Sequence, residues 1–165
     1  MRLLIAFVAL LLSGCWIGTN LYLPVDARAV VTPGTYRWTT PSGEAGVAKV
    51  SIAANGMTSI DVDGDVSLIG LAPLDAQAQT FVSWSTEEDT QFYELAVRQP
   101  DASVILYTPS CEGEQAETAR TAGAMIERGM LSTCRFASRA SLESAMRRIK
   151  PSPNQEAIRF IPTWN

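Results

Sequence analysis

The sequence contains no histidine among its 165 residues. Histidine is the most frequent general base in enzymes and the most frequent metal ligand, so its absence excludes the usual serine triads and most zinc sites. No glycine-rich loop of the kind that cradles phosphates occurs either. An enzyme with this sequence would need carboxylates, a lysine-assisted serine or a bound cofactor. We therefore expect a non-enzymatic protein with no catalytic residue, no cofactor and no metal.

The sequence also has no apolar run long enough to span a bilayer as a helix, which takes about 20 residues. The apolar run at residues 3–12 is shorter than this and follows Arg2. A positive charge, a short apolar run and then small residues are typical of a secretory signal peptide.

The motif Leu12-Ser13-Gly14-Cys15 directly follows this run and resembles the lipobox of bacterial lipoproteins. The resemblance implies cleavage before Cys15 and attachment of a palmitate-containing lipid to Cys15. Several acyl chains together anchor a protein stably, on the periplasmic side of a membrane in that family. In many such lipoproteins, an aspartate directly after the lipidated cysteine marks retention in the inner membrane. Trp16 occupies that position here, so the resemblance favours the outer membrane. An ordinary cleaved signal or an uncleaved anchor is the alternative.

Two further cysteines, Cys111 and Cys134, remain after Cys15. In the oxidising periplasm that the lipobox implies, we expect them to form a disulfide with each other. The alternatives are two buried thiols or a redox pair.

The chain divides by composition into three parts. Residues 1–14 are the expected signal peptide, and residues 15–33 are interpreted as a tether because they contain Pro24 and Pro33 and show no periodicity. Residues 34–165 are expected to form a single periplasmic domain, since the mature chain of about 150 residues suits one core.

The expected domain is α+β, with an antiparallel sheet or a partly open small barrel followed by two helices and a final strand. Period-2 alternation is clear at Ala48, Val50 and Ile52. The first seven candidate strands cover residues 35–39, 47–53, 57–62, 66–71, 80–85, 91–98 and 103–107. A helix at 114–128, a strand at 131–136, a helix at 139–149 capped by Ser138 and a strand at 157–161 follow.

Two expected turns predict which residues of neighbouring strands face each other. A three-residue loop at 54–56, with Gly56 in its third position, predicts that Val50 faces Ile60. By the same reasoning, a three-residue loop at 63–65 predicts that Val62 faces Val66, and that Ile60 faces Leu68.

Two acidic clusters lie in expected turns. Asp61, Asp63 and Asp65 resemble the start of a calcium-binding EF-hand loop, but the required glycine and bidentate glutamate are missing. The cluster at 87–89 lies between two apolar strands. We interpret both clusters as solvated hairpin turns.

Charge is segregated along the chain. Residues 15–117 carry 4 basic and 14 acidic residues, whereas residues 118–165 carry 8 basic and 3 acidic ones. A basic face for anionic lipid headgroups, cell-wall polymer or an acidic envelope protein would consist of Arg135, Arg139, Arg147, Arg148, Lys150 and Arg159. The alternative is that these residues pair internally or face water. Nucleic acid is not an expected partner.

Three functions stay open. The leading hypothesis is a membrane-anchored lipoprotein with a non-enzymatic binding or structural role in the bacterial envelope. The alternative is a carrier of a small apolar ligand, with a pocket in the β-rich half. Its aromatic residues, Trp38 and Trp84 among them, would either line such a pocket or pack a core. A carboxylate-dependent cell-wall hydrolase is the third.

Overall fold

The computed structural model describes residues 16–129, 131–151 and 157–164. The expected signal peptide, the lipobox and Cys15 lie outside the described residues. Within the described part of the chain, no helix is both long enough and apolar enough to cross a bilayer.

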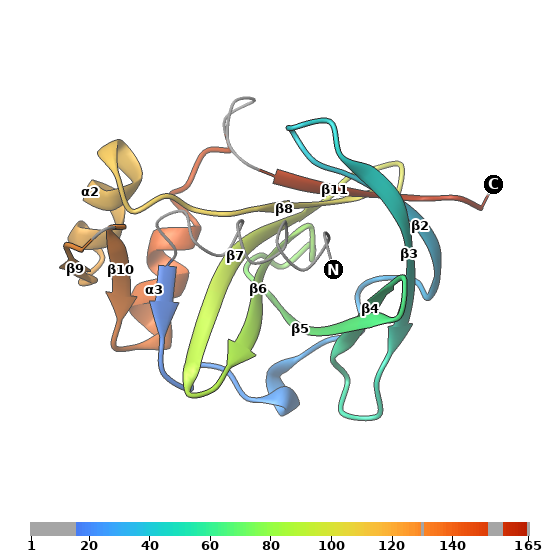
Figure 1. Ribbon diagram of the computed structural model, residues 1–165. Coiled ribbons are helices and arrows are strands. Elements are labelled where there is room, and N and C mark those ends of the chain that lie inside the picture. Colours follow the sequence, from blue (N-terminus) through green and yellow to red (C-terminus); the bar gives the residue numbers. More distant parts are fainter. Residues whose placement is uncertain (1–15, 130, 152–156, 165) are drawn as a thin grey trace.

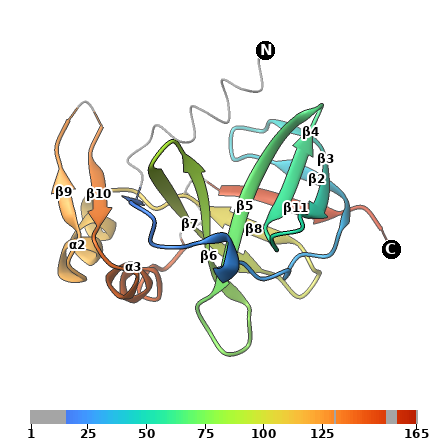
Figure 2. The ribbon, with the colours of Figure 1, turned by 90° about the horizontal axis from the view of Figure 1, so that it is seen from below.

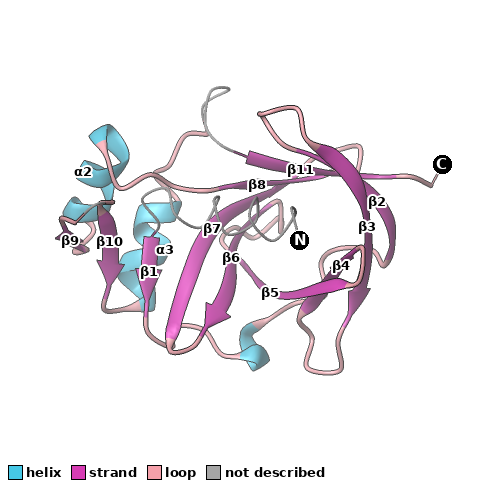
Figure 3. Ribbon diagram, in the orientation of Figure 1, coloured by secondary structure: helices cyan, strands magenta, loops and turns pink. Residues whose placement is uncertain are grey.

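The chain forms a closed barrel of eight antiparallel strands (Figures 1 and 3). Seven follow one another as a meander: β2 (Gly34–Thr39), β3 (Ala45–Ile52), β4 (Thr58–Val62), β5 (Asp65–Pro73), β6 (Thr80–Glu87), β7 (Thr90–Arg98) and β8 (Val104–Tyr107). The eighth, β11 (Ala157–Pro162), pairs with both β8 and β2. The expectation of an open sheet or partly open barrel is therefore corrected, because β11 covers both remaining edges.

A smaller layer extends from the barrel and carries the helices. In Figure 2, β1 (Trp16–Gly18), β10 (Thr133–Phe136) and β9 (Met125–Glu127) lead away from β7, and α2 (Gly113–Thr121) and α3 (Arg139–Met146) lie beside them. Strand β7 belongs to both the barrel and the smaller layer. Its residues Gln91–Tyr93 pair with β1, and its residues Leu95–Arg98 pair with β8.

The segment expected to be a tether is part of the folded structure, so that expectation is wrong for residues 16–33. Trp16 is fully buried, its ring packs against Phe136 at 5.0 Å, and its Nε1 donates a hydrogen bond to the Ser110 carbonyl oxygen at 3.1 Å. Tyr22 stacks on Trp84 at a centroid distance of 4.7 Å. A three-residue strand is too short to show periodicity, and burial of these large rings outweighs the prolines around them.

Alternation along the barrel strands produces two cores. Inward side chains such as Tyr36 and Phe160 form one cluster inside the barrel. Outward side chains of β5, β6 and β7 form a second cluster with β1, α2 and α3, and this cluster contains Trp16 and Trp84. The barrel is thus packed on both faces along one side.

One predicted register is confirmed and the other is corrected. Val50 faces Ile60, as the loop at 54–56 predicts. In the next hairpin Val62 faces Asp65 instead of Val66, because only Asp63 and Gly64 form the turn. Both have positive φ, 54° and 92°, as a two-residue type I′ turn requires.

The correction matters because a shift of one residue inverts the faces of β5. Ser67 takes an inward position opposite Ile60, whereas Val66 and Leu68 face outward and are exposed.

The helix expected at 114–128 ends much earlier. Gly123 has a φ of 97°, its N–H donates to the Arg120 carbonyl, and the Ala124 N–H donates to the Ala119 carbonyl. These two hydrogen bonds form a Schellman motif, which ends the helix before β9 begins. The cap of α3 is confirmed, because Ser138 Oγ accepts a hydrogen bond from the Ser141 N–H at 3.2 Å.

Gly70 lets β5 and β6 approach each other beside Trp84. It faces Trp84 across the two strands, and a Cβ atom at Gly70 would overlap the buried indole ring. We expect Gly70→Ala to lower the free energy of unfolding by about 1–3 kcal/mol through overpacking, measured by urea denaturation. Gly129→Ala, where a Cβ meets only ordinary contacts, is the control. Equal stability of the two variants would contradict this packing.

Candidate functional site

The described barrel contains a cavity of about 420 Å³ near its β4–β5 and β6–β7 turns. Its apolar wall consists of side chains from five strands, namely Ile60, Ile69, Phe92, Leu106 and Ile158. Polar side chains line part of the rest, and Ser67, Ser85 and Glu94 face inward among them. Small inward-facing side chains leave this part of the barrel interior open, whereas large inward-facing side chains fill the other part.

The cavity opens between β5 and β6. These strands pair only between Gly70–Pro73 and Phe81–Trp84, whereas β5 begins at Asp65 and β6 continues to Glu87. Beyond the paired region, the exposed residues Val66, Leu68 and Thr86 also line the cavity. Solvent therefore reaches the cavity along this side of the barrel.

Glu94 is an inward-facing acidic residue of β7 that lines the cavity. Its Oε1 accepts a hydrogen bond from Thr108 Oγ1 at 3.2 Å, and the described residues that line the cavity include no Lys or Arg. Among the ion pairs of the described residues, none includes Glu94. Burial raises the pKa of Glu94, although the Thr108 hydrogen bond opposes this. Glu94 is half-buried overall, and a carboxylate that is removed from water without a nearby cation favours its neutral form.

Ser83 lies opposite Glu94 on β6, on the same inward face. Only 1% of Ser83 is exposed, and its Oγ has no hydrogen-bond partner among the described residues. An unpaired buried hydroxyl is unfavourable. The interior near Glu94 therefore offers more hydrogen-bonding capacity than the described protein groups use.

The other end of the barrel is filled. A second cavity there has a volume of only about 20 Å³ and is lined by large apolar residues such as Tyr36, Leu71 and Phe160. Trp38 and Trp84 line neither of these cavities. Trp38 packs inside the barrel against Gly46, and Trp84 packs outside it against Tyr22, so both tryptophans serve as core residues.

The expected acidic turns lie next to the opening between β5 and β6, because β5 begins at Asp65 and β6 ends at Glu87. Asp61 Oδ1 accepts a hydrogen bond from the Gly64 N–H at 2.9 Å and stabilises the β4–β5 turn. Glu87 ends β6 and lines the cavity. In the described part of the chain, no group of three metal-ligating side chains could hold a metal ion.

Four of the six residues of the expected basic face have carboxylate partners. Arg135 pairs with Glu127 at 2.7 Å, and Arg159 pairs with Asp101 at 3.3 Å. Arg139 pairs with Asp26 and Glu143, and Arg147 also pairs with Glu143. Arg148 and Lys150 are exposed and take part in none of the ion pairs between described residues.

One of these arginines, Arg139, joins α3 to the N-terminal segment. Tyr22 Oη donates to Glu143 Oε1 at 3.0 Å, and the Arg139 guanidinium lies 4.3 Å from the centre of the Tyr22 ring. Burial opposes ionisation of Glu143, but hydrogen bonds from Arg139, Tyr22 and Arg147 hold its pKa below the usual range. This cluster supports the fold and lies outside the cavity.

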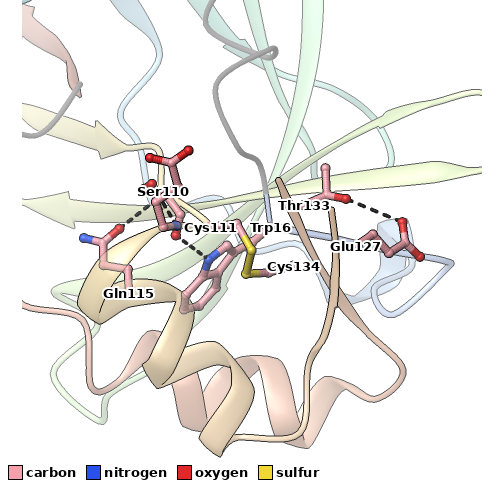
Figure 4. Close-up of a disulfide and its surroundings, with 8 residues drawn as sticks. Trp16, Ser110, Cys111, Gln115, Glu127, Thr133 and Cys134 are labelled. Carbon is pink, nitrogen blue, oxygen red and sulfur yellow. Dashed lines mark hydrogen bonds between the residues drawn. A yellow bond between two sulfur atoms is a disulfide. The ribbon is translucent and has the colours of Figure 1, made fainter. Parts of the chain in front are cut away.

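The expected disulfide is confirmed. Cys111, just before α2, is bonded to Cys134 of β10, with their Cα atoms 5.5 Å apart (Figure 4). Trp16 lies beside the bond, and Gln115 Oε1 accepts a hydrogen bond from the Ser110 N–H at 2.7 Å. Because β10 pairs with β1, the disulfide ties α2 to the strand that begins the described chain.

The fold and cavity therefore define an eight-stranded up-and-down barrel with a helical layer on one side. No protein-family model, curated protein or solved structure matched this chain when they were compared with it.

The raised pKa of Glu94 predicts a pH-dependent stability. Below the unfolded-state pKa of about 4.3 the group is protonated in both states, and the folded state loses stability as the pH rises through the higher folded pKa. We expect Glu94→Gln to have the wild-type melting temperature near pH 4 and a higher one at pH 8. Glu114→Gln, which makes the same change on the exposed surface of α2, is the control. A melting temperature for Glu94→Gln below wild type at pH 8 would contradict this account.

Proposed function

We propose that this protein is a membrane-anchored lipoprotein of the bacterial envelope whose barrel binds a small apolar ligand. The observation that carries the binding proposal is the 420 Å³ cavity with its apolar wall. Pockets for small molecules measure about 300–1,000 Å³ and combine an apolar lining with few polar groups. The lipobox-like motif at residues 12–15 supports the anchor.

The distribution of side-chain size along the barrel supports binding at one end. An eight-stranded barrel is wide enough either to be filled by side chains or to hold one small ligand. Tyr36, Phe81 and Phe160 fill the end near the small cavity, whereas Ser67 and Ser85 occupy inward positions near the large one. An apolar ligand in this space would remove the apolar wall from water.

The position of Trp16 supports a short distance between ligand site and membrane. Consecutive Cα atoms are about 3.8 Å apart, so a lipid on Cys15 would attach one residue from a fully buried side chain. Strand β1 pairs with β7 in the register Ile17–Phe92, and Phe92 lines the cavity. The proposed anchor thus holds the ligand site at the membrane surface without a tether.

Binding of an acidic partner through the basic residues is less well supported, because four of the six are paired with carboxylates of this chain. The absence of enzymatic activity stays a prediction.

The ligand proposal is tested with the neutral fluorescent probe N-phenyl-1-naphthylamine. We expect the wild type to bind it, and Ser85→Phe to reduce the affinity at least tenfold, because the new ring fills the cavity. Ser51→Phe places the same ring on the exposed outer face of β3 and should leave affinity unchanged. Absence of probe binding by the wild type, or equal binding by both variants, would contradict the proposal.

The anchor is tested separately in a bacterial host. We expect Cys15→Ala to release the exported protein from the membrane fraction or to leave it unprocessed, because no thiol remains to carry lipid. Mass spectrometry of the wild type should find the lipid on Cys15. Unchanged membrane retention of a processed Cys15→Ala variant would contradict lipid anchoring and would leave the cavity proposal standing.

A further inference from the structure

We propose that the barrel cavity selects a ligand that joins an apolar chain to a protonated amine, with the ammonium group at Glu94. This inference rests on the proposed function, because it assumes that the cavity binds a small molecule. The proposed ligand therefore belongs to the class of alkyl ammonium cations.

The first argument is the incomplete pairing of Glu94. A carboxylate has about four acceptor sites, and the described residues supply one donor to it, Thr108 Oγ1 at 3.2 Å. Glu94 is half-buried, and a charge removed from water is stabilised by a paired, hydrogen-bonded cation. None of the described residues that line the cavity is basic, so the cation that Glu94 lacks would come from the ligand.

The second argument is the set of hydroxyl groups near Glu94. An ammonium group has three donors and no acceptor. Ser83 Oγ lies across the strand pair from Glu94, is almost fully buried and has no partner among the described residues. Ser85, two residues further along β6, lines the cavity. Ser83 itself is not one of the lining residues, so the Glu94 carboxylate and the Ser85 hydroxyl are the oxygens that suit a donor-only head group.

The third argument is the charge around the open end. In an up-and-down barrel every second turn lies at the same end, and the β4–β5 and β6–β7 turns point the same way in Figure 2. The three turns at this end contain no Lys or Arg, and their exposed carboxylates are those of Glu44, Asp63, Asp65, Glu87, Glu88 and Asp89. The charged side chains of these three turns are all acidic, and such a group of carboxylates attracts cations and repels anions such as fatty acids.

The apolar wall of the cavity would contact the alkyl chain of the ligand. Phe92, Leu106 and Ile158 lie on neighbouring strands near Glu94, and Glu94 and Phe92 are successive inward positions of β7. The ammonium and the chain would therefore contact different parts of one continuous wall.

The test compares three eight-carbon probes by isothermal titration calorimetry at pH 7.5: octylamine, 1-octanol and octanoate. We expect the wild type to bind octylamine at least tenfold more tightly than 1-octanol, and octanoate most weakly. Charge-assisted hydrogen bonds are strong enough that Glu94→Gln should weaken octylamine binding about tenfold to hundredfold. The same substitution should leave 1-octanol binding within about threefold.

Two controls make the result specific. Glu114→Gln makes the same charge change on α2 and should leave all three affinities unchanged. Ser85→Phe should abolish octylamine binding, which separates cavity binding from adsorption to the acidic surface. Retained binding of N-phenyl-1-naphthylamine by Glu94→Gln shows that its barrel is folded.

Equal wild-type affinities for octylamine and 1-octanol would overturn the inference while supporting the proposed function. Octylamine binding that Glu94→Gln does not change would also overturn it. Failure of the wild type to bind any of the three probes or the naphthylamine would overturn both proposals.

Discussion

Closure of the barrel by β11 is the constraint on which the rest of the structure depends. The chain leaves the barrel after Tyr107, forms α2, β9, β10 and α3, and returns at Ala157 to lie between β8 and β2. Arg159 is thereby paired with Ile105 on one side and with Thr39 on the other. Without this strand the meander would be an open sheet with two free edges and no enclosed space.

Strand β7 connects the cavity to the N-terminal segment. Its inward residues Phe92 and Glu94 line the cavity, and its outward residues contact β1 and the helical layer. Gln91, at its beginning, accepts a hydrogen bond from the Tyr22 N–H and donates one to the Tyr22 carbonyl. The Tyr93 hydroxyl donates to the same Gln91 side chain at 2.8 Å. One strand thus holds the proposed ligand site and the segment that follows the proposed anchor.

Local sequence signals predicted much of the barrel. Strand alternation placed the meander strands, and Gly56, with its φ of 83°, gave the Val50–Ile60 register. The same reasoning misjudged the Asp63-Gly64 turn, where two positive φ values remove one residue from the loop. That single residue decides that Ser67, and not Val66, faces the barrel interior.

The site itself depends on contacts between distant parts of the chain. The cavity exists because residues near 160 pair with residues near 38, and no local pattern predicts that pairing. Strand β1 was missed because its partners lie more than 70 residues away and its three residues show no period. Glu94 did carry a signal, since it is one carboxylate between the apolar residues Phe92 and Val97, but its position beside a cavity follows only from the closed barrel.

The central claim, that a small molecule binds inside the barrel beside Glu94, is tested most directly by locating a bound probe. In a two-dimensional NMR titration of the folded protein with octylamine, the largest amide shifts should fall on Ser67, Ser85, Phe92 and Glu94. Amides of α2 and α3, which lie outside the barrel, should stay unchanged. Shifts concentrated on the helices, or no saturable shift along β7, would contradict the account.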